Sequence, residues 1–95
     1  MQFEGFDWDD GNWPKCGKHG LGRMEIEAIV RNAVVQVRDP NPDEARTRLV
    51  GYNGAGRAAF VVVTFRRIGS RRSDRPISAR YMHAKEVDEY EQHQP

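Results

Sequence analysis

Residues 75–90 constrain the fold of this chain most, because their hydrophobic period changes once, at Met82. Before Met82, apolar and polar side chains alternate, which is the period of a half-buried β-strand. Pro76 cannot donate a backbone hydrogen bond and favours the start or the edge of a sheet. After Met82, Val87 and Tyr90 recur at helical spacing. The segment therefore predicts a strand that runs directly into a C-terminal helix.

The junction between this strand and helix gathers charged side chains. Ser78 and Arg80 share the polar face of the expected strand, because successive side chains point to opposite faces. His83 and Lys85 follow at once, and Glu86 lies in the first turn of the expected helix. We therefore expect one guanidinium and several groups able to exchange protons to lie close together here.

Other hydrophobic periods divide the rest of the chain into short elements. They predict a strand over 2–8, a short helix over 13–18, a helix that begins after Gly22, and strands over 34–38, 46–52 and 58–65. Residues 39–43 and 53–56 are typical of turns, and residues 66–74 of a basic loop. The predicted fold is a single α+β domain over 1–95, with a small antiparallel sheet, two N-terminal helices and one C-terminal helix.

Charge is distributed unevenly along the chain, although the formal net charge is only +1. Residues 46–85 carry ten Lys or Arg against a single acidic residue, whereas the segments on both sides are acidic. A basic segment of this kind favours a polyanion or an acidic protein as partner. The alternative is a solvated sheet face on which arginine covers apolar surface.

Cysteine and histidine usage limits the chemistry further. The single cysteine, Cys16, cannot form an internal disulfide, which is typical of a reducing cytoplasm. No signal-peptide pattern or apolar run of transmembrane length is present. We therefore expect a cytoplasmic protein that does not associate with a membrane. The three histidines are too far apart for a local metal motif. We expect no metal and no cofactor.

Short motifs are spread along nearly the whole chain. They are Asp7-Trp8-Asp9, Lys15 with Lys18-His19-Gly20, Glu44 with Arg46, Gly51 with Gly56-Arg57, and Arg75 with Ile77-Ser78-Ala79-Arg80, Glu86 and Tyr90. In this order and spacing they resemble the BrnT family, the small ribonuclease toxins of bacterial type II toxin–antitoxin systems. Two features depart from the family pattern: Gly22 stands where a Ser or Thr cap is usual, and residues 66–74 are unusually rich in arginine.

The resemblance implies a RelE-like fold and an RNA-cleaving enzyme that arrests translation. It also implies neutralisation by a BrnA-like antitoxin with a ribbon-helix-helix DNA-binding part. Contact with DNA would then occur only through the toxin–antitoxin complex.

Metal-independent RNA cleavage needs cations for the phosphorane-like transition state and groups that transfer protons. Arginine suits the first task, because a guanidinium stays charged and donates to phosphate as a fork. We therefore expect Arg80 and Arg57 to stabilise the transition state. A histidine, or a carboxylate whose pKa is raised by burial, suits proton transfer. The candidates for this task are His19, His83 and Glu86.

Substrate binding requires further contacts. Lys18 and Arg46 are candidates for phosphate, and Tyr81 and Trp8 for stacking on an unpaired base. Each candidate also has a structural interpretation. Arg80 can pair with Glu86 or Asp7, the histidines can cap helices, and Trp8 can belong to the core. The alternative function is a catalytically silent module that binds RNA or an antitoxin through its basic surface.

Overall fold

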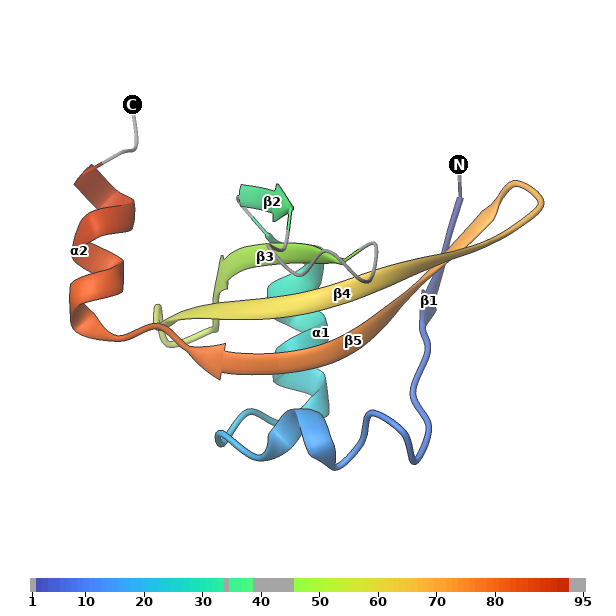
Figure 1. Cartoon of the computed structure of the whole chain (residues 1–95), viewed down its shortest axis with the longest axis horizontal. Coiled ribbons are helices and arrows are strands. Elements are labelled where there is room, and N and C mark those ends of the chain that lie inside the picture. Colours follow the sequence, from blue (N-terminus) through green and yellow to red (C-terminus); the bar gives the residue numbers. More distant parts are fainter. Residues whose placement is uncertain (1, 34, 39–45, 93–95) are drawn as a thin grey trace.

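A five-stranded mixed sheet forms the centre of the computed structural model, with strand order β1-β5-β4-β3-β2 (Figure 1). The structure describes the backbone of residues 2–33, 35–38 and 46–92. In chain order the elements are β1 (Gln2–Phe6), the 3-10 turn η1 (Lys15–Gly17), α1 (Arg23–Arg31), β2 (Val35–Arg38), β3 (Thr47–Tyr52), β4 (Ala58–Ile68), β5 (Arg71–Tyr81) and α2 (Ala84–Gln92). The α+β class and the strand that leads into the C-terminal helix are confirmed.

Two details of the predicted architecture were wrong. The sheet is mixed and not purely antiparallel, because β1 pairs with β5 in the parallel direction. Alternation along a strand does not encode the direction in which it pairs, so the sequence could not show this. The expected helix over 13–18 is only the three-residue turn η1. Gly17 packs against the Trp13 ring, where a Cβ atom would lie 2.8 Å from the ring carbon Cη2.

The basic segment 66–74 is also not a loop. It forms the outer part of the β4–β5 hairpin, which continues from Ala59 opposite Tyr81 to Ile68 opposite Arg71. Gly69 has a φ of +63°, a conformation that glycine adopts without strain, and it turns the chain. The hairpin projects at the end of the sheet opposite α2 (Figure 1). The expected turn at 39–43 lies outside the described residues.

The two faces of the sheet have different covers. On one face, α1 packs Ile26 and Ile29 against Leu49, Val61 and other buried side chains of the main core. This core includes Cys16, a free and buried thiol. On the other face, a smaller cluster of Val50, Ala58 and Met82 receives Val87 and Tyr90 of α2. Helix α2 covers only one end of this second face (Figure 1).

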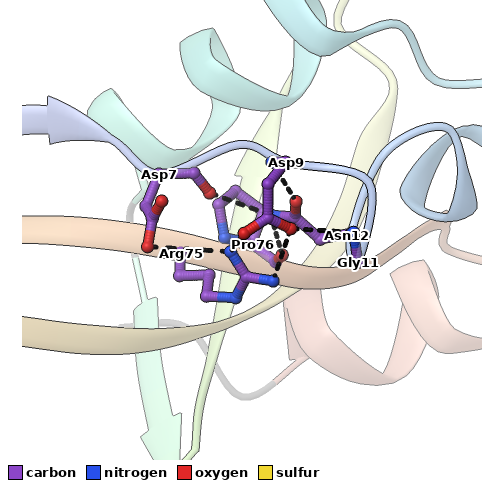
Figure 2. A network of polar contacts seen from close by, with 6 residues as sticks. All are labelled: Asp7, Asp9, Gly11, Asn12, Arg75 and Pro76. Carbon is purple, nitrogen blue, oxygen red and sulfur yellow. Dashed lines mark hydrogen bonds and ion pairs between the residues drawn. The ribbon is translucent and has the colours of Figure 1, made fainter.

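A polar network fixes the segment between β1 and η1 onto β5 (Figure 2). Asn12 is buried, and its Nδ2 donates to the carbonyl oxygens of Asp7 and Pro76, each at 2.9 Å. Its Oδ1 accepts the backbone N–H of Asp9 at 2.8 Å. The guanidinium of Arg75 donates two hydrogen bonds of 2.9 Å to the Asp9 carboxylate. The segment that precedes η1 is therefore held to β5 by specific hydrogen bonds.

Helix length and composition also bear on membranes. Within the ranges that the structure describes, no helix is long and apolar enough to cross a bilayer.

Candidate functional site

A pocket of about 190 Å³ opens on the sheet where β3, β4 and β5 lie side by side. Its lining residues come from these strands and from the loop between η1 and α1: Lys18, His19, Arg48, Phe60, Val62, Ser78, Ala79 and Arg80. The pocket therefore combines three of the residues predicted from the sequence, Lys18, His19 and Arg80, which are far apart along the chain.

Strand pairing explains why the pocket residues meet. Arg48 is opposite Val62, and Val62 is opposite Ser78, so these three side chains form one row across the sheet. Phe60 and Arg80 are opposite each other in the neighbouring row. Directly opposed residues share a face, and residues two apart on a strand share it as well. The pocket thus lies on the face that α2 covers at one end.

Lys18 and His19 reach this pocket along the edge of β5. Strand β1 pairs with residues 71–74 of β5, and within the described parts of the chain no strand lies beside the later residues of β5 on that side. The turn η1 packs against β5, and the loop after it carries Lys18 and His19. Gly20, with a φ of +99°, redirects the chain after this loop, a conformation that glycine adopts without strain.

The electrostatic character of the pocket is cationic. Lys18, Arg48 and Arg80 carry positive charges, and none of the lining residues that the structure describes is acidic. Cations gathered in a concave site attract phosphate, and low-dielectric walls strengthen this attraction. The described part of the chain holds no group of three or more His, Cys, Asp or Glu side chains that could bind a metal ion.

Arg80 is held by Glu86 of α2. Its two terminal nitrogens donate to the two carboxylate oxygens at 2.8 and 2.9 Å, and Nη1 also donates to the carbonyl of Tyr81 at 3.2 Å. The same carboxylate accepts the backbone N–H of His83 at 2.9 Å, at the start of α2. The helix start and the arginine therefore share one anchor.

This pairing changes the protonation behaviour of Glu86. The hydrogen bonds from Arg80, followed by the one from His83, lower the pKa of Glu86 from 4.5 to about 2. Proton transfer near neutral pH requires the opposite shift. The structure thus contains the Arg80–Glu86 ion pair that the structural interpretation expected. The pKa of Arg80 is raised by the same hydrogen bonds, so its guanidinium stays charged.

Arg48 is a pocket residue that the sequence prediction did not select. Its guanidinium lies over the Phe60 ring, 5.1 Å from the centroid, and that of Arg80 lies 4.7 Å from the same centroid. Arg48 could have been selected from the sequence, because it is two residues from the candidate Arg46 and lies on the same face of the expected strand. In the structure this strand, β3, pairs directly with β4. Arg46 itself is half-buried, directly before β3, and is not among the lining residues.

Arg57 and Tyr81 lie apart from the pocket, on the α1 side of the sheet. The Arg57 guanidinium is 3.7 Å from the centroid of the Tyr81 ring, and the Tyr81 hydroxyl donates to Glu25 of α1 at 2.6 Å. The hydrogen bond to Glu25 raises the pKa of Tyr81. Asn53 donates to the same carboxylate at 2.8 Å. These residues fasten the β3–β4 turn and the end of β5 to α1.

Trp8 and His83 also have clear structural surroundings. Trp8 packs edge-on against Trp13 with ring centroids 5.6 Å apart, and its indole N–H donates to Glu27 at 2.8 Å. His83 is exposed and precedes α2, where its carbonyl accepts the backbone N–H of Val87 at 3.0 Å. Neither residue lines the pocket.

Comparison with known proteins gives one family. The model of the family described as "Ribonuclease toxin, BrnT, of type II toxin-antitoxin system" matches residues 8–86, which include every residue that lines the pocket and also Glu86. A search of curated proteins finds no match.

Proposed function

The chain belongs to the family of BrnT ribonuclease toxins of type II toxin–antitoxin systems, and on this premise we propose that it cleaves RNA in the cationic pocket without a metal ion. Membership in a ribonuclease toxin family implies endoribonuclease activity, an RNA substrate and an antitoxin partner. The observation that supports the location is the grouping of Lys18, His19, Arg48 and Arg80 around one pocket whose described lining residues include no carboxylate.

The cationic side chains fit the demands of a phosphodiester transition state. In our proposal the 2′-oxygen attacks phosphorus, the bond to the 5′-oxygen breaks, and a 2′,3′-cyclic phosphate and a 5′-hydroxyl result. Arg80 and Arg48 bind the non-bridging oxygens, whose negative charge increases at the transition state. Arg80 is already oriented by its two hydrogen bonds to Glu86, so little reorganisation is needed.

Proton transfer falls to His19 in this scheme, and Lys18 binds an adjacent phosphate. Imidazole is the side chain whose ordinary titration lies near neutral pH, which suits a group that must both accept and release a proton. His19 lies in the pocket lining, whereas His83 does not. Arg57, Tyr81 and Trp8 are structural in this proposal.

Several further properties of the protein are inferred from its membership in this family. We infer a RelE-like fold for one toxin domain over residues 1–95, and arrest of translation in the cytoplasm. We also infer neutralisation by a BrnA-like ribbon-helix-helix antitoxin, through which the complex contacts DNA. The cationic pocket supports the antitoxin proposal, because an acidic partner surface would compete there with RNA.

The test is RNA cleavage by purified, antitoxin-free protein in the presence of EDTA. We expect products with 2′,3′-cyclic phosphate ends, and Arg80→Ala should lower kcat by a factor of about 100, as loss of one preorganised donor does. Arg23→Ala is the matched control. It removes the same charge from an exposed position on α1, where the guanidinium is 5.7 Å from the Trp13 ring centroid.

Intact RNA together with salt-sensitive RNA binding would favour the catalytically silent binding module. Equal losses in Arg80→Ala and Arg23→Ala would contradict the proposed site. Unchanged circular dichroism and thermal midpoint in Arg80→Ala would show that the loss of activity is not a loss of fold.

A further inference from the structure

Phe60 is an aromatic residue in the lining of the pocket, and two arginines lie over its ring. We propose that Phe60 is a positioning residue: its ring sets the spacing between the guanidinia of Arg48 and Arg80, so that both can bind one phosphodiester. This inference rests on the proposed function, because it describes how the same site is organised.

Strand register brings the two arginines to the ring from opposite sides of β4. Arg80 of β5 is directly opposite Phe60, and the guanidinium lies 4.7 Å from the ring centroid. On β3, Val50 is opposite Phe60, and Arg48 is the diagonal neighbour two residues away, with its guanidinium 5.1 Å from the centroid. Long side chains reach such diagonal neighbours in a sheet. A single ring in the central strand therefore contacts both cations.

An aromatic ring suits this task better than a carboxylate would. Two guanidinia that approach one phosphate repel each other, so something must hold them near each other before substrate binds. The face of an aromatic ring attracts a cation without neutralising it. A guanidinium that lies over the ring can still donate N–H groups to phosphate. For Arg80 these are the N–H groups that Glu86 and the Tyr81 carbonyl do not accept. Phe60 can thus orient both arginines without placing a further carboxylate beside Arg80, which already pairs with Glu86.

Arg80 also has a partner in Glu86, which fixes its other side. The carboxylate takes both terminal nitrogens at 2.8 and 2.9 Å, from the direction of α2. Phe60 is only half-buried and packs against the small cluster of Val50, Ala58 and Met82. The Phe60 ring is therefore accessible from the pocket and is held in place by the apolar cluster against which it packs, as a positioning residue requires.

The experiment compares Phe60→Leu, which keeps apolar bulk but removes the ring, with Phe60→Tyr, which keeps the ring. The matched control is Phe65→Leu in the same strand, because Phe65 also has an arginine over its ring, Arg72 at 4.8 Å, but does not line the pocket. Kinetics on a single-stranded RNA oligonucleotide give kcat and KM separately. The arginine Nε–H resonances, assigned by NMR, report the ring contact in protein without RNA.

We expect Phe60→Leu to lower kcat about tenfold, with a smaller change in KM, because the arginines are charged but less well oriented. The Arg48 and Arg80 Nε–H resonances should lose their ring-current shifts in this variant. Phe60→Tyr should retain most of kcat and the shifts, and Phe65→Leu should leave the kcat of the wild type unchanged.

Each contrary result has one meaning. Cleavage by the wild type with an equal kcat in Phe60→Leu would overturn the positioning role and leave the proposed function intact. Equal losses in Phe60→Leu and Phe65→Leu would also overturn it, because they would indicate a general effect on packing. Absence of cleavage by the wild type would contradict the proposed function, and the NMR shifts would still decide whether the ring holds the arginines.

Discussion

Arg80 shows how one residue can satisfy a structural and a chemical interpretation at once. The sequence placed it on the polar face of a strand next to Glu86, and the structure joins the two by two hydrogen bonds. A partly exposed ion pair contributes little to stability by itself. Its larger effect is to orient the guanidinium, which the proposed chemistry needs.

The pKa of Glu86 gives a prediction about pH and stability. Its folded value is about 2, below the ordinary 4.5, so the folded state favours the ionised form. The stabilisation is fully present above about pH 4.5 and is lost as the pH falls from 4.5 towards 2. The free energy of unfolding of the wild type should therefore fall more steeply across this window than that of Glu86→Gln.

Urea denaturation at several pH values from 6 down to about 2.5 measures this difference by the linear extrapolation method. Other carboxylates titrate in both proteins, so only the difference between the two curves is informative. A difference that stays constant over the window would show that Glu86 is not stabilised by Arg80 in solution.

At the scale of elements, the close approach of α1 to β3 depends on Gly51. A Cβ atom at Gly51 would lie 2.9 Å from the carbonyl oxygen of Ile29 and 3.0 Å from its Cγ2. One of these neighbours is backbone, so the helix itself would have to move. Gly51 was part of the motif pattern in the sequence, but only the structure shows that its small size is what matters.

We therefore expect Gly51→Ala to lower the free energy of unfolding by about 1–3 kcal/mol, the usual effect of overpacking. Gly54→Ala is the control, because Gly54 is exposed and a Cβ atom there has no neighbour within 4 Å. Chemical denaturation of both variants checks the prediction. An equal effect of the two substitutions would indicate that the contact between α1 and β3 tolerates a methyl group.

The segment before η1 is the second element on which the site depends. Asn12 makes three hydrogen bonds that connect this segment to itself and to β5, as Figure 2 shows. The loop with Lys18 and His19 follows η1 directly. Damage to this network should displace pocket residues that are not part of the network.

Asn12→Ala should lower the free energy of unfolding by about 1–3 kcal/mol, because it leaves buried backbone groups without their partner. It should also reduce RNA cleavage, although Asn12 does not line the pocket. The control is Asn32→Ala, since the exposed Asn32 side chain donates to the Ala28 carbonyl at 2.8 Å at the end of α1. Full activity and stability of Asn12→Ala would contradict the positioning role of this network.

For the whole molecule, the fold gathers basic residues from two segments of the chain into one pocket. The basic segment 46–85 supplies Arg48 and Arg80, whereas Lys18 and His19 come from the acidic N-terminal part of the chain. The pocket is therefore more strongly cationic than the net charge of +1 suggests.

Binding of a non-cleavable 2′-O-methyl RNA should weaken as salt rises. A contact with one phosphate of a single strand contributes about 0.7 to the slope of log K against log salt. We expect Arg48→Ala to reduce that slope by about this amount, and Arg23→Ala, on the opposite side of the sheet, to leave it unchanged. Fluorescence anisotropy between 50 and 300 mM salt, roughly the range in which such slopes are linear, measures both. Equal slopes for all three proteins would remove Arg48 from the RNA contact.

Alternation of apolar and polar residues predicts on which face of the sheet each strand residue lies, but not every candidate site residue was chosen by its face. The alternation that placed Arg80 on the polar face also placed Tyr81 on the opposite face, and the structure shows Tyr81 bound to α1. The selection of Tyr81 and Arg57 beside Arg80 followed the type of residue and not the period. Arg48, by contrast, could have been predicted by alternation, because it shares a strand face with the candidate Arg46.

The sequence by itself determined the α+β class, the change from strand to helix near Met82, and the face on which each strand residue lies. These properties follow from hydrophobic periods that extend over a few residues. The tertiary structure alone decided that β1 runs parallel to β5 and that Lys18 and His19 lie beside Arg48 and Arg80. Such contacts join residues far apart in the chain, and they depend on strand pairing and loop anchoring that no local period encodes.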